Sequence, residues 1–249
     1  MLKKAVAIAE AKGFRLIHGI VDSMWLKKPN ADAEEYQELC EQIGREVNYP
    51  IAFEGLYRWV VFLNSRTDPR IPVLNRYYGV FEDGTRKLRG IDLRRDDTPE
   101  IVRRCQMDML AILANAKNSN EFRMLIPESL RVLKAYATNL REGRFNARDL
   151  VISKRLSKNP NEYTNLVPQA IAARHLVKEG GRVHAGQSIS YVLVKSSSRI
   201  LENRALPAEF LSGDTPYDSE KYVELLLSSA VNLLLPFGYN LKSLRTETR

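Results

Sequence analysis

Apolar residues recur along the chain at two spacings, which predict a mixture of helices and strands. Residues 1–12 place alanine, valine and isoleucine at helical spacing between charges, and Gly13 ends this predicted amphipathic helix. Residues 14–28 are rich in Ile, Val, Phe and Trp, which favour strands. They predict two short strands joined by a turn at Gly19 to Asp22.

Strand patterns return between residues 49 and 93. We predict strands over 51–63 and 73–82, and Asp83-Gly84 predicts a hairpin turn into a further strand at 85–93.

Further helices are predicted from their capping residues. A helix over 33–46 follows Pro29 to Asp32, and one over 101–116 has Pro99 near its first turn. A third is predicted over 128–142. Beyond residue 145 the chain becomes basic and rich in turns, so we place a boundary there. The mixture predicts an α+β fold.

Composition places the chain among ordinary globular proteins. Its 249 residues suffice for one large domain or two small ones, and 44% are hydrophobic. The chain has no run of roughly 18 apolar residues that could span a membrane. Charges interrupt the N-terminal segment too early for a signal peptide. Cys40 and Cys105 lie far apart, which predicts reduced thiols and a cytoplasmic location.

The net charge of +8 favours a polyanionic partner, because Lys and Arg neutralise phosphates. A basic surface without such a partner is the alternative. Cations gather in the last third of the chain beside Ser and Asn, a pattern that suits phosphate contacts or a solvated face. They are Lys154, Arg155, Lys158, Arg174, Lys178, Arg182, Lys195, Arg199 and Arg204.

Asp22 is the first candidate for chemistry. A carboxylate at a hairpin tip is exposed and fixed in direction, as a metal ligand must be, but most such aspartates only form the turn. Glu54 on the predicted neighbouring strand is a candidate second carboxylate, although two metal ions need more ligands than these. The segment Asn75-Arg76-Tyr77-Tyr78 joins a guanidinium to two aromatic rings and suits a nucleic-acid backbone, while tyrosine in a strand is also common in cores.

Other catalytic classes lack support. The chain has no Walker loop, no zinc-ligand cluster and no GxSxG motif. Its three histidines are scattered along the sequence, which favours structural or phosphate-facing roles over catalysis. These histidines are His18, His175 and His184.

Six stretches in register carry a family resemblance. The first three read "GFRLIHGIVDSMWLKK", "FEGLYRWVVFL" and "NRYYGVFEDGTRKLRGIDL". The others begin "DLVISKRLSKNPNEYTNLVPQ", "GGRVHAGQSISYVLVK" and "YDSEKYVELLLSSAVNLLLPFGYN". Together they resemble the C-terminal part of archaeal-type family B DNA polymerases, from the second catalytic palm motif through the thumb.

The resemblance implies a role for each matched position. Asp22 falls on the second aspartate of the DTD hairpin, which binds both catalytic Mg²⁺ ions, and Glu54 on a palm carboxylate that assists the site. Asn75, Arg76 and Tyr77 fall on the strand that grips the primer–template duplex. Further matches are Arg89, Gly90 and Asp92 in the RG-x-[D/E] segment and the thumb cations Lys154, Arg155, Arg174, Arg199 and Arg204.

The implied architecture is a partial palm with an antiparallel sheet and helices over 1–110. A mostly helical thumb with a small β-containing insertion follows over 111–249. The exonuclease domain, the fingers and the palm motif with the other metal-binding aspartate lie outside this sequence. The resemblance therefore implies a partner subunit that supplies them, with primer–template DNA and deoxynucleoside triphosphates as substrates and no membrane. The expected location is the cytoplasm, at the nucleoid.

Three substitutions depart from the family pattern. Ile20 and Val21 replace the first aspartate and the threonine of DTD, and Asn75 replaces a lysine.

Two main hypotheses follow for the function. The chain is the small subunit of a split polymerase, inactive alone, or it is an inactivated subunit that binds DNA or forms a scaffold. A piece of a longer gene product is a third. Clamp binding would come from a partner, because the sequence ends without the tail that family members use for it.

Overall fold

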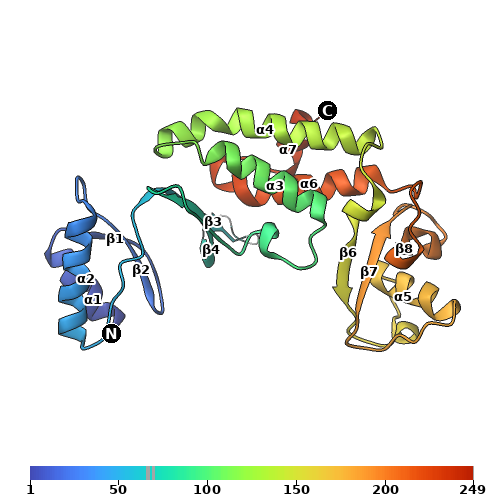
Figure 1. The fold of residues 1–249 in the computed structure, drawn as a ribbon, viewed down its shortest axis with the longest axis horizontal. Coiled ribbons are helices and arrows are strands. Elements are labelled where there is room, and N and C mark those ends of the chain that lie inside the picture. Colours follow the sequence, from blue (N-terminus) through green and yellow to red (C-terminus); the bar gives the residue numbers. More distant parts are fainter. Residues whose placement is uncertain (66–67, 69–70, 249) are drawn as a thin grey trace. The chain divides into compact units, whose positions relative to one another are not determined.

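The computed structural model describes residues 1–65, 68 and 71–248, which form two compact units, residues 1–89 and 90–249 (Figure 1). Within the described residues there are seven α-helices and three small antiparallel sheets. The predicted α+β class is therefore confirmed. The predicted palm–thumb boundary at residue 110 lies within a helix of the second unit, and the assignment of palm and thumb to 1–110 and 111–249 stays a prediction.

The first unit begins with helices packed on a two-stranded hairpin. Its elements are α1 (Leu2–Ala11), β1 (Arg15–Ile20), β2 (Ser23–Lys27) and α2 (Ala33–Val47). The Asp32 side chain accepts a hydrogen bond from the Glu35 backbone N–H at 3.0 Å, so it caps α2 as predicted. The helices share a core with the hairpin, made of Ala5, Ala9, Phe14, Leu39 and Ile43, which we call the α1–α2 cluster.

A three-stranded sheet completes the first unit. Its strands are β3 (Tyr57–Asn64), β4 (Pro72–Phe81) and β5 (Arg86–Arg89), with β4 in the centre. The predicted turn between β4 and β5 is confirmed, since Asp83 accepts a hydrogen bond from the Thr85 N–H at 2.7 Å and Gly84 has a φ of +87°. Gly79 has no room for a side chain, because a Cβ there would lie 2.9 Å from the Trp59 carbonyl oxygen.

The predicted strand over 51–63 begins later than expected, at Tyr57. Residues 51–55 form no backbone hydrogen bond with any described residue. Their alternating pattern is typical of a strand, but a strand also needs a hydrogen-bonding neighbour.

The second unit is built on long helices. These are α3 (Glu100–Leu113), α4 (Ser119–Arg141), α6 (Ser219–Leu234) and the short α7 (Leu241–Glu247). The predicted start of α4 at residue 128 was wrong, because the helix runs through Pro127. Asn118 caps the earlier start by accepting hydrogen bonds from the N–H groups of Asn120 and Glu121.

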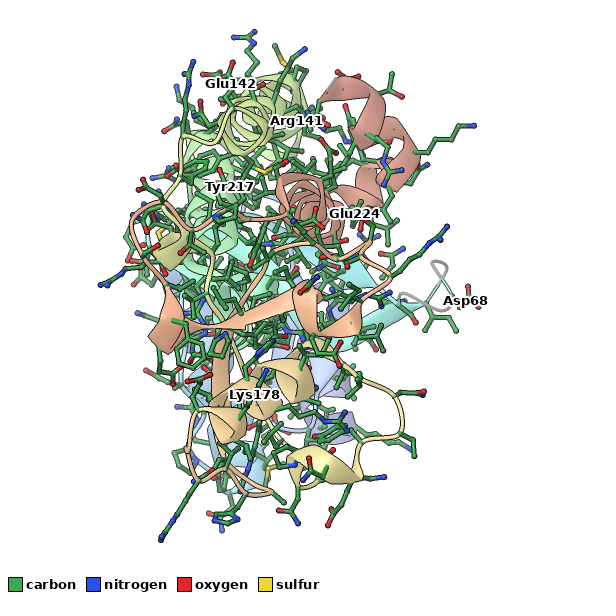
Figure 2. The ribbon with its side chains drawn as sticks, turned by 90° about the vertical axis from the view of Figure 1, so that its right-hand side faces the viewer. Asp68, Arg141, Glu142, Lys178, Tyr217 and Glu224 are labelled. Atoms are coloured by element: carbon green, nitrogen blue, oxygen red, sulfur yellow. The ribbon has the colours of Figure 1, made fainter. Side chains whose placement is uncertain are left out.

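Polar contacts join α4 to the C-terminal helices, in the region where Figure 2 labels Arg141, Tyr217 and Glu224. The Arg141 guanidinium donates to Glu220 and to the Thr248 carbonyl oxygen, both at 2.7 Å. The Tyr217 hydroxyl donates to the Leu140 carbonyl oxygen at 3.1 Å. These bonds fix the end of α4 against α6 and the residue that follows α7.

A small β-containing part follows α4 in the second unit. Its sheet has β7 (Ser188–Leu193) between β6 (Ile152–Arg155) and β8 (Ala205–Pro207), and α5 (Pro168–Lys178) packs against it. The 3₁₀ turns are Asp92–Arg94, Ala147–Leu150, Pro160–Glu162, Leu201–Arg204, Ala208–Phe210 and Leu235–Phe237. Among the described helices, none alone is long and apolar enough to cross a membrane; α6 and α7 meet that test only as a pair bent by 112°.

Candidate metal-site hairpin and nucleic-acid interface

Asp22 lies at the exposed tip of the β1–β2 hairpin. Ile20 pairs with Ser23, so the turn consists of Val21 and Asp22 alone and is shorter than predicted. Val21 is 91% exposed, and the Ser23 hydroxyl donates to the Asp22 carboxylate at 3.3 Å. The tip therefore presents one carboxylate to solvent, beside an apolar side chain.

The base of the hairpin is held on both faces. On one face, Met24 and Leu26 pack against the α1–α2 cluster. On the other, the His18 ring lies 4.4 Å from Phe62, and Trp25 lies 5.0 Å from Tyr77, between ring centroids. Packing on two faces fixes the direction in which Asp22 projects, which a ligand or catalytic group requires.

Glu54 lies in the unpaired run before β3, not in a strand. Its carboxylate is exposed and forms an ion pair with Lys87 of β5. In the part of the chain that the structure describes, no group of three or more His, Cys, Asp or Glu side chains is placed to hold a metal ion. Mg²⁺ demands a near-octahedral set of oxygens, so the described residues do not form a complete site.

The predicted duplex-gripping strand is the central strand of its sheet. Asn75 is exposed on β4, and the Arg76 guanidinium donates to the Asn64 carbonyl oxygen at 3.5 Å. Tyr77 is 4% exposed and lies within the aromatic packing beneath the hairpin. Arg89 is exposed and opposite Tyr77 in the register with β5.

Three of the five cations that the resemblance places in the thumb donate to backbone carbonyl oxygens of their own chain. The Arg174 guanidinium donates to the carbonyl oxygens of Pro160 at 3.0 Å and Tyr163 at 3.3 Å. Arg155 donates to the Gly186 carbonyl oxygen at 2.7 Å, and Arg204 to that of Ser198 at 2.8 Å. These arginines hold loops in place.

Lys154 and Arg199 differ from those arginines. Lys154 lies 3.9 Å from Asp97, whose pKa is held below its usual range by hydrogen bonds from Arg95 and by Lys154 nearby. Arg199 is exposed and forms no hydrogen bond or ion pair with the described residues. Among the predicted thumb cations, Arg199 is therefore the clearest candidate for contact with a phosphate.

Comparison with known proteins identifies the family. Residues 2–237 match the sequence model of DNA polymerase family B. The chain belongs to this family. The whole chain is 24% identical to a DNA polymerase of Archaeoglobus fulgidus, over 32% of that protein. Over 96% of its length it is 27% identical to a DNA polymerase of Thermococcus sp. (strain 9oN-7), covering 30% of that one.

The fold is that of the family as well. The structure of the family B DNA polymerase from Pyrobaculum calidifontis matches 96% of this chain with a TM-score of 0.69 and 24% identity. The match covers 29% of that polymerase. This family B chain thus spans about a third or less of the length of the relatives that it matches.

Sequence analysis did not foresee two parts of the hairpin's environment. The packing of His18 and Trp25 on Phe62 joins residues far apart in sequence, and no local sequence signal indicates it. The Tyr36 hydroxyl donates to the Leu26 carbonyl oxygen at 3.3 Å, and no sequence signal indicates this contact.

Proposed function

We propose that this chain is the C-terminal palm–thumb portion of a family B DNA polymerase whose remaining parts come from another polypeptide. It acts on primer–template DNA and deoxynucleoside triphosphates, in the cytoplasm at the nucleoid. The observation that supports this most is the family match along nearly the whole chain, combined with an exposed Asp22 on a hairpin that is packed on both faces.

In this proposal Asp22 supplies one carboxylate to a Mg²⁺ site that the partner completes. Bound Mg²⁺ would neutralise the charge that develops during nucleotidyl transfer. The chain's own residues position the carboxylate through the two packed faces of the hairpin. Asn75, Arg76 and Arg89 contact the duplex near the palm, Arg199 contacts its backbone at the thumb, and the isolated chain does not polymerise DNA.

A second candidate function rests on the hairpin tip. Ile20 and Val21 place apolar side chains where the family has an aspartate and a threonine, and Val21 is 91% exposed. An inactivated subunit that binds DNA or forms a scaffold tolerates these residues, because it needs no second carboxylate.

The decisive experiment is Mg²⁺-dependent primer extension. The chain is co-expressed with the polypeptide of the same genome that carries the remaining family B regions. Asp22→Asn is compared with Asp83→Asn, which removes the same charge from another hairpin turn. We expect Asp22→Asn to lower the extension rate by at least about 100-fold, equivalent to about 2.7 kcal/mol, because it loses a metal ligand.

Asp83→Asn should keep extension within about twofold. Equal activity of the Asp22→Asn and unsubstituted complexes would contradict a catalytic role. A stable complex that never extends a primer, with or without the substitution, would favour the inactivated subunit.

A further inference from the structure

We propose that Asp97 is a positioning residue for duplex binding: its carboxylate holds the Lys154 ammonium in place and leaves the N–H groups of that ammonium free to donate to a phosphate. Both residues belong to the second unit, Asp97 in the loop before α3 and Lys154 on β6. Figure 1 draws this loop beside β6. The inference rests on the proposed function, because the phosphate is that of the primer–template duplex.

The Asp97 carboxylate is oriented by one arginine. Arg95 donates to both of its oxygens, from Nε and from Nη2, each at 3.0 Å. A bidentate pair of this kind is directional, so it fixes the plane of the carboxylate. The hydrogen bonds from Arg95, together with the charge of Lys154, hold the pKa of Asp97 below its usual range. Asp97 is therefore ionised at neutral pH.

The loop that carries Asp97 is fixed on the helices of the second unit. The Arg103 guanidinium donates to the Arg95 carbonyl oxygen at 2.6 Å, and the Leu93 N–H donates to the Gln106 side chain at 2.7 Å. Gln106 is buried and donates in turn to the Ser229 hydroxyl of α6 at 2.8 Å. Bonds within the chain thus set the position of the carboxylate before any ligand binds.

Lys154 is attracted to this carboxylate without a hydrogen bond to it. Its Nζ lies 3.9 Å from Asp97 Oδ2, beyond hydrogen-bonding distance, and its ammonium forms no hydrogen bond with the described residues. Arg95, Asp97 and Lys154 are two cations and one carboxylate, so the group remains attractive to an anion. The ammonium therefore has a preferred position and keeps its donors for a phosphate oxygen.

Contacts at two further points keep β6 beside the loop of Asp97. The Arg104 guanidinium on α3 donates to Asp149, which lies in the 3₁₀ turn before β6. Burial raises the pKa of Tyr191 on β7, and the charge of Asp97 adds to this shift, which places Asp97 against the sheet. The Asp97–Lys154 pair is thus part of a fixed junction between α3 and the small sheet.

A carboxylate near DNA has two opposite effects. Its charge repels phosphates, so removal of an ordinary exposed carboxylate raises duplex affinity. A positioning carboxylate restricts a cation that would otherwise lose side-chain freedom on binding, so its removal lowers the affinity. The sign of the change separates the two effects.

The test compares Asp97→Asn with Asp96→Asn in the co-expressed complex, by anisotropy of a labelled primer–template duplex. Asp96 is the matched control, because it is exposed, carries the same charge and forms no ion pair with the described residues. We expect Asp97→Asn to lower duplex affinity by about two- to fivefold, the range that exposed ion pairs contribute, and Asp96→Asn to leave it equal or higher. An equal or higher affinity in Asp97→Asn would overturn the positioning role and leave the proposed function standing.

A double-substitution cycle supplies a readout that a purely structural role would not move. Lys154→Ala should make the salt slope of duplex affinity shallower by about 0.9, the value for one phosphate contact. In the Lys154→Ala background, Asp97→Asn should cause no further loss, because its effect passes through Lys154. An undiminished loss in that background would exclude the proposal. If the unsubstituted complex binds no duplex, the proposed function and this inference both fail.

Discussion

At residue 77 a phenol ring packs 5.0 Å from Trp25 and 5.9 Å from Phe62, and only 4% of the residue is exposed. The family resemblance assigns Tyr77 to the strand that grips the duplex. Its burial leaves no ring surface for DNA: the ring packs β4 against the hairpin, while Asn75 is exposed on the same strand.

Substitution of Tyr77 separates packing from direct contact with DNA. We expect Tyr77→Ala to lower the free energy of unfolding by about 3–5 kcal/mol, because a large aromatic side chain leaves a cavity. Tyr77→Phe should change it by less than about 1.5 kcal/mol and leave duplex affinity unchanged. Urea denaturation followed by tryptophan fluorescence measures the first, and anisotropy of a labelled duplex the second. A tenfold loss of affinity in folded Tyr77→Phe would show that the hydroxyl contacts DNA.

At the scale of elements, α4 shows how local signals compete. Pro127 lacks an N–H and usually ends a helix at the preceding residue. Here the Asn118 cap and the burial of Phe122 and Ile126 support the turns before the proline, so the helix continues through it. Tertiary packing of an apolar face outweighs the local cost.

Replacement of this proline should stabilise the second unit. Pro127 is exposed, so Pro127→Ala restores a backbone hydrogen bond without filling or emptying the core. We expect the free energy of unfolding to rise by about 1–3 kcal/mol, within the proline penalty measured in helices. Thermal and urea unfolding of the full chain would measure it. A lower stability would indicate that α4 needs a bend at this residue.

Elements with their own start and stop signals could be predicted from sequence. Asp32 at the start of α2 and Asp83-Gly84 between β4 and β5 are examples, because the deciding contacts lie within a few residues. Residues 51–55 could not be predicted correctly, since strand formation depends on a neighbour that the described chain lacks. The surroundings of Asp22 follow the same logic: the residue is visible in the sequence, but the side chains around it come from distant segments.

At the scale of the whole molecule, the net charge is +8. The arginines that contribute to it differ in whether they bond to their own chain. Arginines such as Arg174 and Arg204 donate to backbone carbonyl oxygens and stabilise loops. Arg199 is exposed without such a partner in the described chain. Net charge alone therefore does not give the number of phosphate contacts, and the salt dependence of duplex affinity would measure it.

The last prediction uses that measurement on Arg199 and Arg174. The logarithm of duplex affinity should fall linearly with the logarithm of salt concentration, and Arg199→Ala should make the slope shallower by about 0.9, the value for one phosphate contact. Arg174→Ala should lower the free energy of unfolding by about 1–3 kcal/mol, because the part-buried carbonyl oxygens of Pro160 and Tyr163 lose a charged donor. Anisotropy titrations across a salt series, paired with urea unfolding, distinguish the two. An unchanged slope in Arg199→Ala would remove this residue from the DNA interface and leave the thumb's contact to other cations.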